Sequence, residues 1–259
     1  MISNNPYDKY RQTLREKSLL TSKEDLDKAW PGRSKYDPET FKPLSFPGIS
    51  VIHNIDDSTA QKLKLSPMAK SFKQSLVDAG MGNKFAFVSL NSFHATTFDL
   101  LNEGEHSEKL IKQGFEYSNI RLNMEKAAIN FLRDRKLKIS AKATIEGIGM
   151  FATAGVVKLD LGLDDSVKNI FQTYRVELNK HLVKEVAGYS FIRNDDWNQT
   201  LSGHITFGYI VNSLTDEEIE IYLERLKAFN DGFEPISFEL TQGEVMQFAD
   251  MDNYAAVDY

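Results

Sequence analysis

Two short motifs carry residue types that can do acid–base chemistry, and each is a histidine followed two residues later by a threonine. They are His94 with Thr96 and His204 with Thr206. Both motifs lie in segments with apolar flanks that are typical of β-strands. Side chains two residues apart in a strand point to the same face, roughly 6.5 Å apart. Each histidine should therefore share a surface with the threonine of its own motif, while the residue between them faces a core.

This combination suits the cleavage of a phosphoester. The reaction needs a base that takes a proton from the attacking oxygen and an acid that protonates the leaving oxygen, and histidine serves both because its unperturbed pKa is about 6.5. Threonine hydroxyls can donate to the non-bridging oxygens, where negative charge concentrates. We therefore predict that His94 and His204 are catalytic and that Thr96 and Thr206 bind the phosphate, without a metal ion or cofactor.

Other side chains near the motifs are candidates for substrate contacts. Arg175 lies on the helix predicted before the second motif, where it is either a surface residue or a phosphate clamp. Phe98 has the strand parity to share a face with His94 and could stack on a base. Tyr209 has the opposite parity to His204, so we expect it to pack in the core.

The remaining histidines lack a hydroxyl residue two positions later. We expect His53 in the core and His106 on the surface. Two acidic pairs, Asp56-Asp57 and Asp195-Asp196, fall in predicted loops. No ligand spacing in the sequence indicates a metal site, although a metal-dependent hydrolase that uses the two motif histidines and nearby acids remains an alternative.

Length, charge and cysteine content limit the functional classes. The chain has 259 residues, a net charge of −6 and no cysteine. Proteins that hold long duplex nucleic acid usually show a basic face, so the charge favours a small phosphorylated or nucleotide substrate, an RNA end included. The lack of cysteine excludes a disulfide framework and a thiol nucleophile. The sequence contains neither a signal-peptide core nor an apolar run of membrane-spanning length, so we predict a cytoplasmic protein without membrane contact.

The element pattern predicts an α+β fold. Residues 1–47 are polar and proline-rich, and we expect an N-terminal arm with one short helix that starts at Ser22. Residues 48–259 are expected to form a single domain. Strands are expected at 48–53, 85–90, 94–101, 137–145, 151–161, 203–211, 236–240 and 244–248. Helices are expected at 58–79 with a break at 66–67, after Asn123, and from 164 or 165 onward. A further helix is expected after Thr215, which should form a capping box with Glu218. Several strands adjoin each other directly, which favours antiparallel sheets flanked by helices. A long helix followed by a His-x-Thr strand occurs once in each half, a faint duplication.

These motifs resemble the two-histidine (2H) phosphoesterase superfamily, whose signature is a pair of His-x-Thr/Ser motifs on strands of a two-lobed α+β fold. The sequence is most similar to an uncharacterised bacterial branch, in which Ser-Phe-His-x-Thr precedes an aromatic residue and an acid, as in residues 92–99. In that branch His-Ile-Thr precedes an aromatic residue, as in residues 204–209. The stretch Lys35-Tyr36-Asp37 followed by Phe46-Pro47-Gly48 is also similar, and Tyr36 is a further candidate for substrate binding.

The resemblance implies an active site in the cleft between two lobes. It also implies a phosphodiesterase that uses one histidine as base and the other as acid. Its expected substrates are a cyclic nucleotide, a 2′,3′-cyclic phosphate, a 2′,5′-linked or cyclic oligonucleotide, or an RNA end. A non-catalytic module that binds nucleotides or RNA ends is the second alternative, beside the metal-dependent hydrolase.

Overall fold

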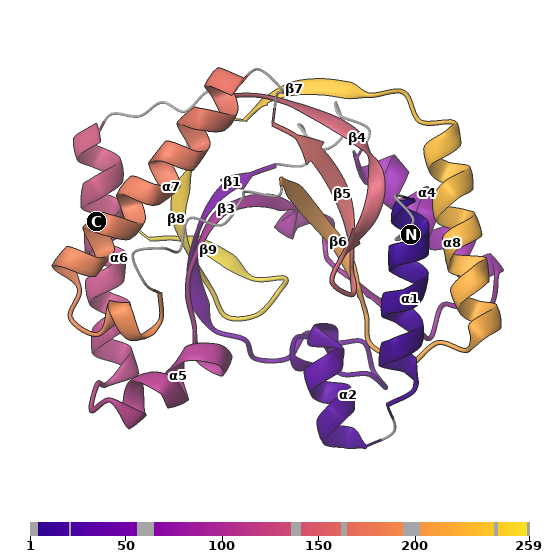
Figure 1. The fold of residues 1–259 in the computed structure, drawn as a ribbon, viewed down its shortest axis with the longest axis horizontal. Coiled ribbons are helices and arrows are strands. Elements are labelled where there is room, and N and C mark those ends of the chain that lie inside the picture. Colours follow the sequence, from indigo (N-terminus) through magenta and orange to yellow (C-terminus); the bar gives the residue numbers. More distant parts are fainter. Residues whose placement is uncertain are drawn as a thin grey trace.

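The computed structural model describes residues 5–20, 22–55, 65–135, 141–161, 165–193, 203–240 and 243–257. In these residues seven α-helices and nine strands form an α+β fold around one antiparallel sheet (Figure 1). The helices are α1 (Pro6–Ser18), α2 (Lys23–Ala29), α4 (Leu65–Asp78), α5 (Glu103–Lys112), α6 (Tyr117–Arg135), α7 (Asp165–Glu185) and α8 (Asp216–Asp231). The strands are β1 (Gly48–Asn54), β2 (Phe85–Phe87), β3 (His94–Asn102), β4 (Ala141–Phe151), β5 (Ala154–Asp160), β6 (His204–Ile210), β7 (Ile236–Leu240), β8 (Glu244–Phe248) and β9 (Tyr254–Ala256). Among the described residues, no helix has both the length and the apolar character that a membrane crossing requires.

The sheet consists of two halves that meet at the motif strands. Its strand order is β7-β4-β5-β6-β3-β1-β8-β9, and β2 also pairs with β6. Strands β3 and β6 pair only through Ala95 and Ile205, whereas β1 and β3, and likewise β5 and β6, form longer ladders. The junction of the two halves is therefore the point at which the two predicted motifs come together.

Each half of the sheet has its own helices (Figure 1). Helix α6 packs against β8 and β1, and α7 packs against β3. On the other half, α8 packs against β4, and Phe72 of α4 contacts Phe207 of β6 with ring centroids 5.6 Å apart. Helix α4 precedes β3 in the chain but packs on the β6 half, and α7 precedes β6 but packs on the β3 half. The helix that precedes each motif strand in the chain therefore packs on the other half of the sheet.

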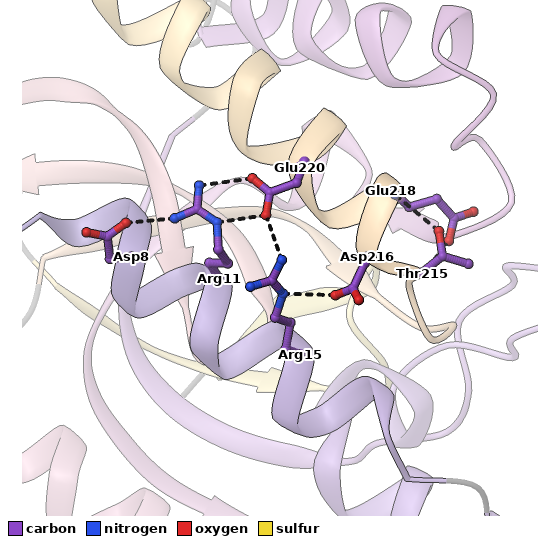
Figure 2. Close-up of polar contacts among 7 residues, drawn as sticks. All are labelled: Asp8, Arg11, Arg15, Thr215, Asp216, Glu218 and Glu220. Carbon is purple, nitrogen blue, oxygen red and sulfur yellow. Dashed lines mark hydrogen bonds and ion pairs between the residues drawn. The ribbon is translucent and has the colours of Figure 1, made fainter.

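Arginine–carboxylate pairs join α1 to α8 (Figure 2). Arg11 donates from Nε and Nη2 to the two carboxylate oxygens of Glu220, at 2.7 and 2.9 Å, and from Nη1 to Asp8 at 2.7 Å. Arg15 donates to Asp216 at 2.8 Å and to Glu220 at 3.1 Å. Partly exposed pairs of this kind are each worth under about 1 kcal/mol, so they orient α1 on α8 more than they stabilise the fold.

Residues 5–47 also supply apolar side chains to the core. Leu14, Trp30 and Tyr36 are fully buried and belong to the same hydrophobic cluster as the residues of the sheet. This segment, predicted as an arm, thus packs closely on the remainder of the protein.

Two capping predictions are confirmed. Thr215 accepts from the backbone N–H of Glu218 at 3.2 Å while the Glu218 carboxylate accepts from the backbone N–H of Thr215 at 2.7 Å, which completes the capping box of α8. Ser22 accepts from the backbone N–H of Asp25 at 3.1 Å at the start of α2. Both caps depend on side chains three residues apart, so they are set by local sequence.

Two predicted helix boundaries are wrong. Asn123 was expected to cap a helix, but α6 begins at Tyr117 and its buried face begins with Ile120, so Asn123 lies inside it. The break expected at residues 66–67 is not seen, because both residues lie within the described helix α4. Residues 58–64 of that predicted helix lie outside the described residues.

Candidate active site

The two motif strands pair through the residue at the centre of each motif. In an antiparallel pair the flanking residues point to the opposite face from the central ones. His94 and Thr206 therefore flank the pair at one end, and Thr96 and His204 flank it at the other. Diagonal neighbours of this kind lie roughly 7–8 Å apart, which leaves space for a phosphoryl group between the histidines. All four side chains line one cavity of about 420 Å³, a volume in the range of small-ligand sites.

A β-bulge follows the first motif. In the ladder with β1, Thr96 and Phe98 have adjacent partners, so Thr97 is an extra residue. A bulge reverses the alternation of the side chains beyond it. Phe98 therefore lies in the core at 1% exposure and does not line the cavity, while Thr97 and Asp99 do. The prediction that Phe98 shares the face of His94 is wrong for this reason.

The same irregularity follows the second motif. Phe207 is the extra residue between Thr206 and Gly208 in the ladder with β5. Tyr209 belongs to the hydrophobic core, as predicted, and because of the reversal it also lines the cavity. Its ring is still buried, against the ring of Tyr36 at 5.7 Å between centroids. In each half, the side chain three residues after the motif threonine thus lines the cavity.

The other two candidates from the sequence have different positions. Tyr36 lies behind Tyr209 rather than in the cavity, and its hydroxyl donates to Asp252 at 3.1 Å. Burial, followed by the Asp252 charge, raises the pKa of Tyr36 above its usual value. Arg175 of α7 does line the cavity, and it is buried rather than on the surface. Burial, followed by the charge of Arg193, lowers the pKa of Arg175, but a guanidinium stays charged at working pH.

Lys35 is a cavity residue that the sequence analysis did not select. Its ammonium donates to the Tyr209 hydroxyl at 3.2 Å and lies 4.8 Å from the centroid of that ring and 5.1 Å from the centroid of the Phe46 ring. Burial lowers the pKa of Lys35, but Tyr209, Asp99 and Glu105 more than offset this, so its pKa lies above its usual value. Lys35 lies far from both motifs in the chain, so no spacing rule pointed to it.

His94 is held as a neutral imidazole with a defined tautomer. Its Nδ1–H donates to the backbone carbonyl of Ser92 at 2.7 Å, which leaves the lone pair on Nε2. The ring lies 4.5 Å from the ring of Tyr254, between centroids. Burial lowers the pKa of His94 to about 4; the Ser92 carbonyl opposes this shift, whereas His204 and Lys35 add to it. His94 therefore has the protonation state of a general base at neutral pH.

His204 is covered on one face by an aromatic side chain. The ring of Phe151 stacks on it with centroids 4.6 Å apart and an interplanar angle of 18°. Phe151 ends β4 and is 51% exposed, and Ala152 follows it with a left-handed φ of 53°. Both residues line the cavity. The β4–β5 turn thus forms a wall that shields His204 and keeps an aromatic surface open to a ligand.

The predicted positions of the other histidines and of the acidic pairs can be compared with the structure. His53 is buried in β1, as predicted. His106 is also buried, and its Nδ1 accepts from the backbone N–H of Asn102 at 3.1 Å; the prediction of an exposed residue is wrong because helix α5 was not foreseen. Asp56-Asp57 and Asp195-Asp196 lie outside the described residues. Within the described ranges, no three histidine or acidic side chains are grouped to hold a metal ion.

A second hollow adjoins the first at His94. It has a volume of about 740 Å³ and shares His94, Phe248 and Tyr254 with the first cavity. Because His94 lines both the first cavity and the second hollow, a ligand whose phosphorus lies between the two motifs could extend from the first cavity into the second hollow.

Comparison with known proteins identifies a shared fold. No family model matches the chain, and no curated protein matches it. Among solved structures, the chain is similar to the conserved protein of unknown function ATU0111 from Agrobacterium tumefaciens, with a TM-score of 0.53 and 18% identity over 92% of this chain and 98% of that one. It is also similar to TT0787 of Thermus thermophilus, with a TM-score of 0.43 and 12% identity over 81% and 94% of the two chains. The chain thus shares its fold with ATU0111 along almost its whole length, and its function has to be argued from the site.

Proposed function

We propose that the protein is a metal-independent phosphodiesterase of the two-histidine (2H) type, with its active site in the cleft where two lobes join. The observation that carries this proposal is the placement of both His-x-Thr motifs around a single antiparallel residue pair, facing one cavity. Two imidazoles and two hydroxyls arranged in this way supply a base, an acid and two oxygen ligands. The substrate class is a cyclic nucleotide, a 2′,3′-cyclic phosphate, a 2′,5′-linked or cyclic oligonucleotide, or an RNA end.

In this proposal His94 is the base and His204 is the acid. The hydrogen bond from Nδ1 of His94 to Ser92 leaves Nε2 free to take a proton. As the attacking oxygen loses its proton to His94, it forms a bond to phosphorus. The bond from phosphorus to the leaving oxygen breaks, and that oxygen takes a proton from His204. Thr96 and Thr206 donate to the non-bridging oxygens throughout.

The walls of the cavity suit a nucleotide. Phe151 and Tyr254 offer aromatic surfaces next to His204 and His94, respectively, and bases stack on such surfaces in a sequence-tolerant way. Arg175 adds a positive charge that favours an anion although the whole chain is acidic. The two hollows that meet at His94 favour a diester with a substituent on each side of the phosphorus.

A substrate panel tests the proposal and distinguishes it from the two alternatives. The panel contains 2′,3′-cyclic and 3′,5′-cyclic mononucleotides, 2′,5′- and 3′,5′-linked dinucleotides, cyclic dinucleotides and RNA with a cyclic phosphate end. We expect turnover of at least one member, and we expect the rate to persist in excess EDTA. Protein with His94→Ala, purified in parallel, controls for contaminating enzymes. Loss of activity in EDTA that one divalent ion restores would favour the metal-dependent hydrolase, and binding without any turnover would favour the binding module.

The pH dependence should show an acid limb far below the usual histidine range. Because the pKa of His94 is lowered to about 4, its neutral base form dominates at every pH above that value. The pH dependence of kcat/KM reports the pKa values of the free enzyme. As the pH is lowered, kcat/KM should stay constant until about one pH unit above the pKa of His94 and then fall. Short assays across pH 4.5 to about 9, with folding checked by circular dichroism, would measure this; an acid limb near pH 6.5 would contradict the role given to His94.

A further inference from the structure

We propose that Lys35 is a fixed cation of the active site, which binds a non-bridging oxygen of the phosphoryl group and stabilises its charge in the transition state. This inference rests on the proposed function and adds to it an anion-binding residue that lies outside both His-x-Thr motifs. Three observations carry it: the hydrogen-bonding state of the ammonium, the way in which the backbone presents it, and the contrast with a second partly buried lysine.

The ammonium of Lys35 has hydrogen-bonding capacity left for a ligand. An ammonium has three N–H donors, and here one of them binds the Tyr209 hydroxyl. Within the described part of the chain, no carboxylate lies within 4.0 Å of Lys35. The rings of Tyr209 and Phe46 hold the cation by their faces and offer no further hydrogen-bond acceptor apart from that hydroxyl. Two donors therefore remain for an anion in the cavity that Lys35 lines.

Burial of a lysine is costly unless other groups compensate for the desolvation of its charge. Lys84 shows the arrangement that serves structure alone. Its ammonium lies 3.1 Å from the Glu218 carboxylate and donates to the backbone carbonyl of Ser213 at 2.9 Å, and it lies outside the cavity. Lys35 has no ion pair of this kind among the described residues. Tyr209, Asp99 and Glu105 offset the desolvation of its charge, so the ammonium stays protonated and can bind a phosphoryl group between the motifs.

The backbone presents Lys35 rigidly to the site. Its N–H donates to the carbonyl of Gly32 at 3.1 Å, and its own carbonyl accepts from Leu44 N–H at 2.8 Å. Gly32 lies so close to β6 that an added Cβ would lie 2.6 Å from Cβ of Tyr209 and 2.8 Å from the carbonyl oxygen of Ile210. The close approach therefore requires glycine, and it places the lysine beside the second motif strand. A charge that is positioned before the reaction needs no reorganisation as negative charge develops.

The chemistry gives this cation a specific task. The motif threonines are neutral donors, and the chain as a whole repels anions because its net charge is −6. The acidic residues Asp99 and Glu105 also line the cavity. Lys35 thus adds a second cation to Arg175 in the cavity, and its position beside Tyr209 would direct the phosphoryl group to the β6 side, away from Asp99.

The experiment compares Lys35→Met with Lys35→Arg and with the matched control Lys84→Met. Methionine keeps the length and apolar stem of lysine without its charge. We expect Lys35→Met to lower kcat/KM by about 10²-fold or more, the usual loss for one donor to developing charge, and to weaken binding of inorganic phosphate in calorimetry by at least about tenfold. Lys35→Arg keeps a cation and should retain measurable phosphate binding. Lys84→Met should lower Tm and leave the kinetics and phosphate affinity of the folded protein unchanged.

The phosphate measurement separates the failure of this inference from the failure of the proposed function. If the wild-type protein turns over no diester but binds phosphate in a way that Lys35→Met abolishes and Lys35→Arg retains, Lys35 is an anion-binding residue and the assigned chemistry is wrong. If diesters are turned over and Lys35→Met matches the wild type in kcat/KM and phosphate affinity, the function stands and the inference is overturned. Should Lys35→Met fail to fold, Lys35→Gln is judged by the same two readouts. The variant Tyr209→Phe keeps the ammonium of Lys35 and removes only the hydroxyl that it binds. If this variant loses as much activity as Lys35→Met, and phosphate affinity is unchanged in both variants, the lysine serves only to hold that tyrosine.

Discussion

His94→Ala and His204→Ala are each expected to lower kcat by about 10²-fold or more, since each removes the acid or the base of the reaction. The double variant should be only slightly slower than either single variant, because groups that act as a unit are not additive. Both side chains are only partly buried in the wall of the cavity, so the variants should keep the Tm of the parent protein. Single-turnover and steady-state rates on the substrate found in the panel would measure the effect.

His181→Ala is the matched control for the histidine pair. His181 is partly exposed, packs beside Phe131 with ring centroids 5.4 Å apart, and does not line the cavity. Its loss should leave kcat and KM unchanged. Ligand affinity that survives in the His94 and His204 variants would separate catalysis from binding. If either variant kept the parental rate, that histidine would not be the acid or the base.

Thr96→Val and Thr206→Val are expected to have the next largest effect, a fall in kcat of about 10²-fold for each. Valine keeps the branched shape that a strand favours and removes only the hydroxyl that donates to the non-bridging oxygens. The loss should be larger in kcat than in KM, because the charge on these oxygens grows toward the transition state. Steady-state kinetics of both variants would show this distribution.

Thr144→Val controls for the loss of a strand hydroxyl outside the site. The Thr144 hydroxyl on β4 lies 2.9 Å from the Ser237 hydroxyl on β7, and Thr144 does not line the cavity. Its replacement should change stability slightly and leave the rate unchanged. Parental rates in both motif-threonine variants would show that these hydroxyls are structural, and the phosphate-binding role would then be withdrawn.

Local features of the fold were predictable from short stretches of sequence. The strands at residues 236–240 and 244–248 were predicted with the bounds that β7 and β8 have, and the capping box at Thr215 was predicted with both partners. Such features depend on side-chain alternation or on contacts three residues apart. Helices α1 and α5 were missed although Asn5 and Asn102 cap them, because both segments are polar in overall composition and tertiary packing stabilises them.

The β-bulges mark the point at which local reasoning about the site failed. Alternation alone placed Phe98 on the face of His94, but the extra residue Thr97 turns it into the core. Alternation also gave Tyr209 no place in the cavity, whereas the extra residue Phe207 lets it line the cavity while its ring stays in the core. A bulge is defined by how two strands pair, and the partner strands lie far away in the chain. No window of sequence around either motif contains that information.

The sequence by itself determined which residues can carry the chemistry: two histidines, each with a threonine on its own face of a strand. That part follows from residue type and from the two-residue period of a strand, which are local properties. Only the tertiary structure decided that the motifs meet through one residue pair. It also decided that Arg175 from α7 and Lys35 from the N-terminal segment enter the same cavity. Contacts between segments so distant in the chain are set by the packing of the whole core, so a single sequence shows the chemical groups but not their assembly.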